Sequence, residues 1–319
     1  ELAQLRGWRG GSLRAEGPQA AALNQGGAVV KRHHLALPEK FENWTRLQTA
    51  KDVPDQGACG SCWAVASITV LKAHSEIGGN PRTFSAQEML NCVQNPMECG
   101  GTGGCEGATA ELAFDYVSKF GIATEKENPY LARDSTCRKS NAVAPSNIFA
   151  QGVDSQSLKQ QLAELVTPGV HEVQLTSLAS SVGMKAWERL PENEYLPLVR
   201  ALVEHGPVAI SVSAGAWSTY GRGIFDGCSK DAVIDHAVTL LGYSKQGSKK
   251  YWIVQNSWGR SWGMNGHIHL LREESDSHHC GTDRQPEMGT GCKGGPSSVK
   301  VCGMCGILYD NVVPHFSRS

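Results

Sequence analysis

The pattern of apolar positions predicts helices in the first half of the chain and strands in the second. Residues Ser61 to Ile77 are apolar on almost every side, which is typical of a buried helix. Apolar residues recur at helical spacing in further segments, and short β-like runs follow them. The remaining helices are predicted at Ala108–Phe120, Ser157–Val166 and Glu194–His205, and the strands at Val208–Val212, Ala237–Tyr243, Tyr251–Val254 and His267–Leu271. This order predicts an α+β fold in which helices and sheet are segregated.

The composition changes at about residue 37. Residues 1–36 are rich in Gly, Ala, Gln and Arg without a sustained apolar period, so we interpret them as a poorly ordered leader or a pro-segment remnant. Residues 37–319 form the predicted folded unit. Lys and Arg number 30 and Asp and Glu number 31, a balance that argues against nucleic acid as a partner. No apolar run is long enough to predict a membrane span.

The cysteine content indicates disulfide bonds and an oxidising compartment. The chain has 11 cysteines, and an odd number leaves at least one thiol unpaired. Residues 56–63 have the sequence Gln-Gly-Ala-Cys-Gly-Ser-Cys-Trp, which places Cys62 at the start of the apolar helix. The positive end of the helix dipole and a neighbouring imidazolium would both stabilise a thiolate there. Gln56 is expected to aim its amide N–H₂ at an oxyanion forming beside Cys62.

The other interpretation of this segment is an ordinary disulfide or redox pair between Cys59 and Cys62. A base for the thiol favours the nucleophile instead. His236 precedes Asn256 with one strand-turn-strand unit between them, and a hairpin would bring the two side by side. Asn256 can then accept a hydrogen bond from one imidazole nitrogen, so that the other nitrogen faces Cys62.

Together these segments resemble the papain-like cysteine proteases, over about residues 37–314. The motifs that carry the resemblance are residues 56–63, 84–92, 104–108, 234–238 and 256–263. The resemblance implies a two-lobed fold with the active-site cleft between the lobes. It places a helical left lobe at about 48–145 and an antiparallel, β-barrel-like right lobe at about 146–310, with an insertion at about 274–304.

The resemblance also implies roles for individual residues. The catalytic residues would be Cys62, His236, Asn256 and Gln56, and the substrate-binding residues would be Gly107, Ala108, Ser211, Ile234, Asp235 and Trp258. Ala108 replaces the second Gly of a turn whose backbone pairs with the substrate's P2 residue in this family. Ile234 and Ser211 fall where the family lines its S2 pocket, which favours Leu, Val or Phe at P2. Trp258 would shield the bond between His236 and Asn256 from water.

The resemblance pairs Cys59 with Cys105 and Cys92 with Cys137. For Cys228 the chain offers two partners, Cys280 and Cys305, and we prefer Cys280. The remaining cysteines would form two further bridges and leave Cys62 free; they are Cys99, Cys292, Cys302 and Cys305. A competing hypothesis is a zinc site made by Cys280, Cys292, Cys302, Cys305 and the pair His278–His279. The oxidising compartment argues against it, so we predict no metal.

The predicted function is a cysteine-type endopeptidase that hydrolyses peptide or protein substrates through a thioester and needs no cofactor. The alternatives are an inactive papain-like subunit with a structural or binding role, and an exopeptidase of the same family. A pro-segment or a cystatin-like inhibitor is an expected partner, and a monomer is the expected state. We expect a lysosomal, vacuolar or secreted protein, because the cysteines indicate an oxidising compartment. We also expect a glycoprotein, because Asn43-Trp44-Thr45 is an N-glycosylation sequon.

Overall fold

The computed structural model describes residues 36–137 and 183–316. The leader predicted at 1–36 therefore falls almost wholly outside the described residues, and so does the helix predicted at Ser157–Val166. Within the described ranges no helix combines the length and apolarity needed to cross a bilayer.

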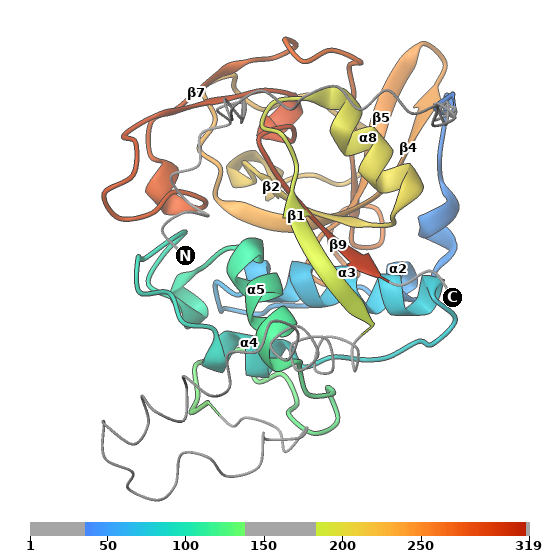
Figure 1. The fold of residues 1–319 in the computed structure, drawn as a ribbon. Coiled ribbons are helices and arrows are strands. Elements are labelled where there is room, and N and C mark those ends of the chain that lie inside the picture. The colour runs from blue at the N-terminus through green and yellow to red at the C-terminus, as the bar shows by residue number, and fades with distance from the viewer. Residues whose placement is uncertain (1–35, 138–182, 317–319) are drawn as a thin grey trace, which may run out of the picture.

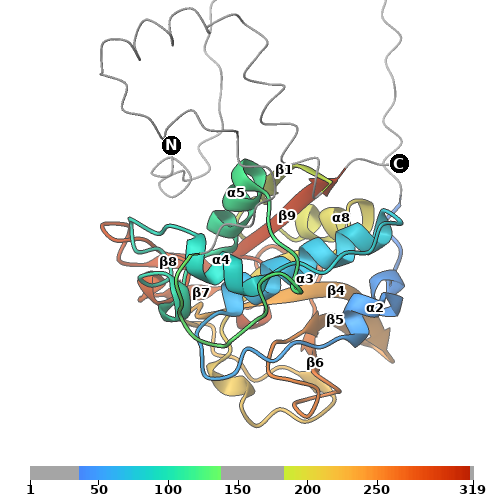
Figure 2. The same ribbon diagram turned by 90° about the horizontal axis from the view of Figure 1, so that it is seen from below.

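The helices gather mainly in one lobe, as the sequence predicts. Figures 1 and 2 show the three helices α3, α4 and α5 together on one side of the molecule. The α-helices are α2 (Gln48–Lys51), α3 (Cys62–Ile77), α4 (Ala86–Cys92), α5 (Ala110–Phe120) and α8 (Tyr195–Glu204). The predictions for α3, α5 and α8 are confirmed to within two residues. Helix α4 was not predicted; this short helix is capped by Ser85, whose hydroxyl accepts the Glu88 N–H at 2.9 Å.

The other lobe is built on a seven-stranded sheet with the order β1-β9-β2-β4-β5-β6-β3. Its strands are β1 (Met184–Arg189), β2 (Val208–Val212), β3 (Ile224–Phe225), β4 (His236–Gln246), β5 (Lys249–Gln255), β6 (His267–Leu271) and β9 (Asp310–Phe316). Neighbours are antiparallel except β3 and β6, which are parallel. The sheet is open, because its edge strands β1 and β3 do not pair with each other. The lobe is therefore an open mixed sheet and not a closed barrel.

Strands β2 and β6 have the predicted bounds, and β4 and β5 are longer than predicted. Strands β1 and β9 were not predicted. Strand β9 begins with Asp310 and Asn311 and contains Pro314, residues that are depleted in strands. Its place between β1 and β2 overrides this weak local preference, because both neighbours supply backbone partners.

Helix α3 lies between the two lobes. It packs against α5, α2 and β4, and 12 of its 16 residues are buried. Trp63 and Leu71 of α3 share a core with Phe114 of α5 and Ala237 of β4. Figure 2 shows α3 running alongside β4. Contact on all sides explains why this segment is apolar all round instead of along one stripe.

Five disulfides cross-link the described residues, and Cys62 is free. They are Cys59–Cys105, Cys92–Cys137, Cys99–Cys292, Cys228–Cys305 and Cys280–Cys302. The pairs Cys59–Cys105 and Cys92–Cys137 are confirmed.

The preferred pair Cys228–Cys280 is wrong, because Cys228 bonds to Cys305. The reason is the register of a small hairpin, β7 (Gly281–Asp283) with β8 (Val299–Val301), in which Gly281 lies opposite Val301. This register brings Cys280 next to Cys302. The zinc hypothesis is also wrong, since the sulfur atoms of its four cysteines, Cys280, Cys292, Cys302 and Cys305, are all in disulfides.

We expect peptide mapping under non-reducing conditions to recover these five pairs, with only Cys62 open to a thiol label before reduction. Each bridge restricts the unfolded chain and contributes about 2–4 kcal/mol, so mild reduction should also lower the melting temperature sharply. Recovery of Cys228 bonded to Cys280 would contradict the register of β7 and β8.

Candidate active site

The free thiol lies where the two lobes meet. Cys62 is the first residue of α3, and the turn before the helix is held by the Cys59–Cys105 disulfide and by the Gly60 N–H, which donates to the Cys105 carbonyl at 2.9 Å. Gly60 is required here, because a Cβ on it would lie 2.4 Å from the same carbonyl oxygen. Cys62 hydrogen bonds to His236, which begins β4 on the opposite lobe.

This contact sets the charge of both residues. Burial alone would raise the pKa of the Cys62 thiol, but the hydrogen bond and charge of His236, with the N–H groups of Ala237 and Trp63, lower it below its ordinary value. Burial would lower the pKa of His236, but its bond to Cys62, the thiolate charge and its bond to Asn256 raise it. Both shifts favour the charged form of their group, a thiolate at Cys62 facing an imidazolium at His236.

The orientation of the imidazole is fixed from behind. The side-chain oxygen of Asn256 accepts the Ser257 backbone N–H at 2.8 Å, which identifies this atom as Oδ1. The same Oδ1 lies 2.8 Å from His236 Nε2, so Nε2 must donate. Nδ1 is then the nitrogen left for Cys62. The structure thus brings together three of the predicted catalytic residues: Cys62 at the start of α3, His236 at the start of β4 and Asn256 just after β5. The predicted hairpin of β4 and β5 places His236 beside Asn256.

Aromatic rings cover this hydrogen bond. The Trp258 ring centroid lies 5.1 Å from that of His236, and the Trp217 ring meets His236 edge-on at 6.2 Å. As a result Asn256 is 1% exposed. A bond excluded from water is electrostatically stronger than the same bond in solvent. Trp258 therefore packs on the imidazole, as predicted, and Trp217 joins it.

Gln56 is held in a fixed orientation on the other side of Cys62. Its Oε1 accepts the Ser257 hydroxyl at 2.5 Å, and its Nε2 donates one hydrogen to the Cys59 carbonyl at 2.9 Å. The second N–H of this amide remains for another acceptor. Tyr130 adds a hydrogen bond to the Gln56 carbonyl at 2.9 Å. Ser257 therefore contacts both Gln56 and Asn256.

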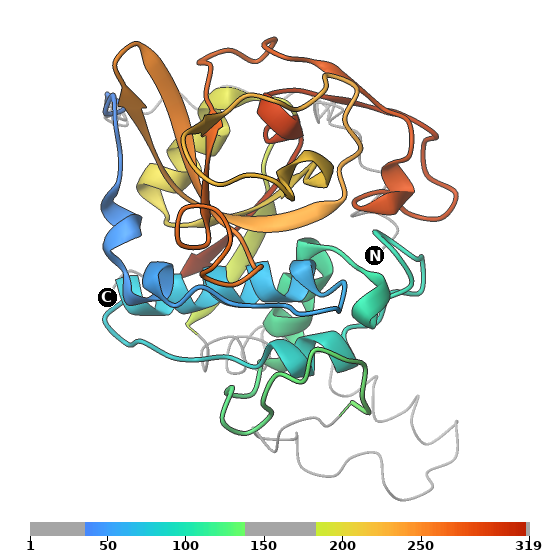
Figure 3. The same ribbon diagram turned by 180° about the vertical axis from the view of Figure 1, so that it is seen from behind.

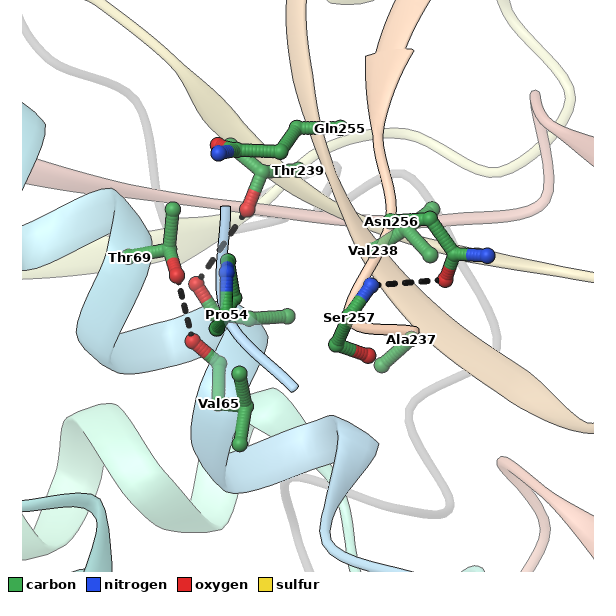
Figure 4. Close-up of a pocket in the computed structure, with 10 residues that line it drawn as sticks. Pro54, Val65, Thr69, Ala237, Val238, Thr239, Gln255, Asn256 and Ser257 are labelled. Atoms are coloured by element: carbon green, nitrogen blue, oxygen red, sulfur yellow. Dashed lines mark hydrogen bonds between the residues drawn. The ribbon is translucent and has the colours of Figure 1, made fainter. Parts of the chain in front are cut away.

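The lobe interface behind these residues is tightly packed. Figure 4 shows Thr69 and Val65 of α3 facing Thr239 and Ala237 of β4. The Thr239 hydroxyl crosses the interface to the Ala66 carbonyl at 3.5 Å. Gln255, at the end of β5, donates to the Thr49 carbonyl at 3.2 Å. These contacts fix the start of α3 relative to the start of β4.

A cleft of about 190 Å³ opens in front of Cys62 and His236. Four of the six predicted substrate-binding residues line it: Gly107, Ala108, Ser211 and Asp235. The Ser211 hydroxyl is already engaged, because it donates to the buried carboxylate of Asp310 at 2.7 Å. Ile234 is fully buried and packs with Val301 and Tyr309, so it does not line the cleft.

One group of potential metal ligands occurs among the described residues: Glu188, His205 and His315, whose ligand atoms lie within 4.8 Å of one another. Glu188 Oε1 already contacts His315 Nε2 at 3.2 Å. After burial, the charges of His205 and His315 lower the pKa of His74, which lies near the end of α3 opposite Cys62. This group is therefore separate from the cleft.

The family model described as papain family cysteine protease matches residues 37–290. The chain belongs to the papain family of cysteine proteases. The cysteine proteinase RD21A of Arabidopsis thaliana is 32% identical over 255 residues, which are 78% of this chain and 46% of that protein. A KDEL-tailed cysteine endopeptidase of the same plant is 31% identical over 252 residues, 77% of this chain and 57% of that protein. The chain thus spans about half the length of these curated relatives.

Solved structures agree with this assignment. The proform of the ragweed pollen cysteine protease Amb a 11 has a TM-score of 0.60 and 25% identity, over 90% of this chain and 69% of that one. The α+β, two-lobed fold expected from the sequence is therefore confirmed as the papain fold.

Four residues near the site of this papain-family chain escaped the sequence analysis. Ser257 stands inside the quoted motif 256–263, and its position beside Asn256 was the available signal. Trp217 and Tyr130 lie outside every motif, and only the fold brings them near His236 and Gln56. Met288, from the insertion, lines the cleft beside Gly289.

We expect His236→Phe to raise the pKa of the Cys62 thiol above its value in the unsubstituted chain. Burial, the largest influence, persists when a ring of similar size fills the site, whereas the hydrogen bond and positive charge are lost. The rate of alkylation by iodoacetamide as a function of pH measures this pKa. His269→Phe, which replaces a histidine stacked on Tyr251 in the sheet, is the matched control. Equal alkylation of both variants at acidic pH would contradict the ion pair.

Proposed function

We propose that this protein is a cysteine-type endopeptidase that hydrolyses peptide bonds through a thioester. The observation that carries the proposal is the contact between the free thiol of Cys62 and His236, whose other nitrogen is held by Asn256 at 2.8 Å. Nucleophile, base and orienting group are the three parts that such catalysis needs.

In the proposed reaction the Cys62 thiolate attacks the carbonyl carbon, and the carbonyl π electrons move onto oxygen. The imidazolium of His236 gives its proton to the leaving amine as the C–N bond breaks, which leaves a thioester and a neutral imidazole. His236 then takes a proton from water, the water oxygen attacks the thioester, and Cys62 leaves as a thiolate. The first oxyanion would accept from the second N–H of Gln56 and from the backbone N–H of Cys62.

We further propose an apolar residue at P2, since Ala108, Ala110 and Met288 contribute apolar surface to the cleft. The substrates would be peptides or proteins, with a pro-segment or a cystatin-like inhibitor as a competing occupant of the same cleft and a monomer as the active form. Five disulfides favour an oxidising compartment, either lysosomal, vacuolar or secreted.

We expect Cys62→Ala to abolish peptide hydrolysis while the fold and the five disulfides remain. Gln56→Ala should lower kcat by about 10²–10³-fold, the usual effect of removing one oxyanion donor. Gln94→Ala, at an exposed position of the helical lobe, is the matched control and should retain full activity. Appreciable turnover by Cys62→Ala would refute the assignment of the nucleophile.

The pH dependence of kcat/KM should be bell-shaped. Activity should rise on the acid side as the Cys62 thiol, whose pKa is lowered, loses its proton. It should fall on the alkaline side as His236, whose pKa is raised, loses its own. Asn256→Ala removes a hydrogen bond that raises the pKa of His236, so the alkaline limb should move to lower pH. A profile that rises steadily through the alkaline range would contradict the mechanism.

A further inference from the structure

Residues 286–293, here called the strap, cross from one lobe to the other beside the cleft. The strap belongs to the right lobe by sequence, since it lies between β7 and β8. Buried Asp283 anchors its start, because Asp283 Oδ2 accepts the Ile234 N–H at 3.0 Å and Oδ1 accepts the Gln285 N–H at 2.7 Å. The Cys280–Cys302 bridge closes the hairpin from which it emerges.

The far end of the strap is fixed to the left lobe by four independent contacts. Cys292 is bonded to Cys99. The Gly100 N–H donates to the Gly291 carbonyl at 2.9 Å, and the Lys293 N–H donates to the Met97 carbonyl at 2.9 Å. Lys293 Nζ also pairs with Glu98 Oε1 at 2.8 Å. In Figures 1 and 3 the red segment of the C-terminal part descends toward the green loop of the helical lobe.

Between these anchors the strap fills the width of the cleft. A Cβ on Gly289 would lie 1.9 Å from the carbonyl oxygen of Ile234 in the right wall. A Cβ on Gly100, in the left wall, would lie 2.3 Å from the carbonyl oxygen of Gly289 and 2.9 Å from that of Ala108. The main chain of Gly289 therefore touches both walls, whereas a peptide strand needs about 4.8 Å to each neighbouring strand. No extended chain can pass at this point.

Met288 is the strap residue whose side chain faces the cleft. Its side chain is 60% exposed, and it lines the cleft together with Gly289, Gly107 and Ala108. An exposed methionine in a cleft is an adaptable apolar contact for a ligand side chain. Asp235, next to His236, also lines the cleft, and its Cα would lie 2.9 Å from a Cβ on Gly289.

We propose that the strap ends the substrate cleft just beyond P2. The proposal rests on the proposed function, because it takes the main chain of Ala108 as the partner of P2 and thereby sets the direction of the substrate. P1 then lies at Cys62, and P2 lies between Ala108 and Met288. Residues farther toward the substrate's N-terminus must turn out into solvent. The favoured substrates are thus peptides recognised by P2 and P1 alone, with no contribution from P3 or beyond.

The test measures binding by the whole chain carrying Cys62→Ala, so that turnover is not needed. The probes are the N-acetylated amide of Leu-Ala-Ser-Ala and the same peptide extended at its N-terminus by one, two or three alanines. Calorimetry should give a Kd that is constant within threefold, or weaker, as the peptide lengthens. A Kd that tightens tenfold or more on extension would overturn the proposal, and so would failure of every peptide to bind.

Opening the strap provides the complementary measurement. Adding Cys99→Ser and Cys292→Ser should make the longer peptides bind at least threefold tighter than the shortest one. The matched control, Cys92→Ser with Cys137→Ser, removes a bridge within the left lobe and should keep the flat dependence on length. A flat dependence in the opened variant, with its fold intact, would overturn the proposal. If that variant fails to fold, the first series still decides.

Hydrolysis of the same peptides by the unmodified chain tests the proposed function separately. Absence of cleavage for every peptide, with the flat binding series preserved, would refute the peptidase and leave the end of the cleft in place. Cleavage whose kcat/KM rises tenfold as the peptide is extended at its N-terminus would support the peptidase and refute the end of the cleft at the strap.

Discussion

The packing of α3 against β4 is the constraint on which the rest of this structure depends. Cys62 and His236 come from different lobes and lie far apart in the sequence. They meet only because α3 starts where β4 starts, with Ala66 and Thr239 in contact behind them. A shift of α3 by one turn would move Cys62 by about 5.4 Å, farther than a hydrogen bond can stretch. The buried side chains on all faces of α3 prevent that shift.

Electrostatics then depends on this geometry. Burial disfavours both a thiolate and an imidazolium, and the largest influence opposing it on each residue is the hydrogen bond and charge of the other. The orientation of the imidazole depends on two successive hydrogen bonds: the Ser257 N–H fixes the amide of Asn256, and this amide fixes Nε2 of His236. Ser257 also holds Gln56, so one short residue connects the amide that orients His236 to the amide of Gln56.

Disulfides restrain what packing alone leaves adjustable. Cys59–Cys105 holds the turn that leads into Cys62. Cys99–Cys292 joins the two lobes directly across a sequence separation of 193 residues. In a fold whose function depends on the gap between two lobes, such a bond fixes the gap at one end. It also fixes the strap, so the shape of the cleft is determined by an insertion as much as by the shared fold.

The sequence alone predicted the residues of the proposed catalytic centre, the α+β order and most elements, because motifs and apolar periods are local signals. The apolar period predicts α3, and the spacing of His236 and Asn256 predicts a hairpin. Tertiary structure decided what local signals do not encode. Cys280 joins Cys302 because of the register of β7 and β8, which no cysteine spacing reveals. Strand β9, polar at its start, forms because β1 and β2 flank it. Ile234 lies outside the cleft because its side chain packs with Val301 and Tyr309, which are distant in sequence.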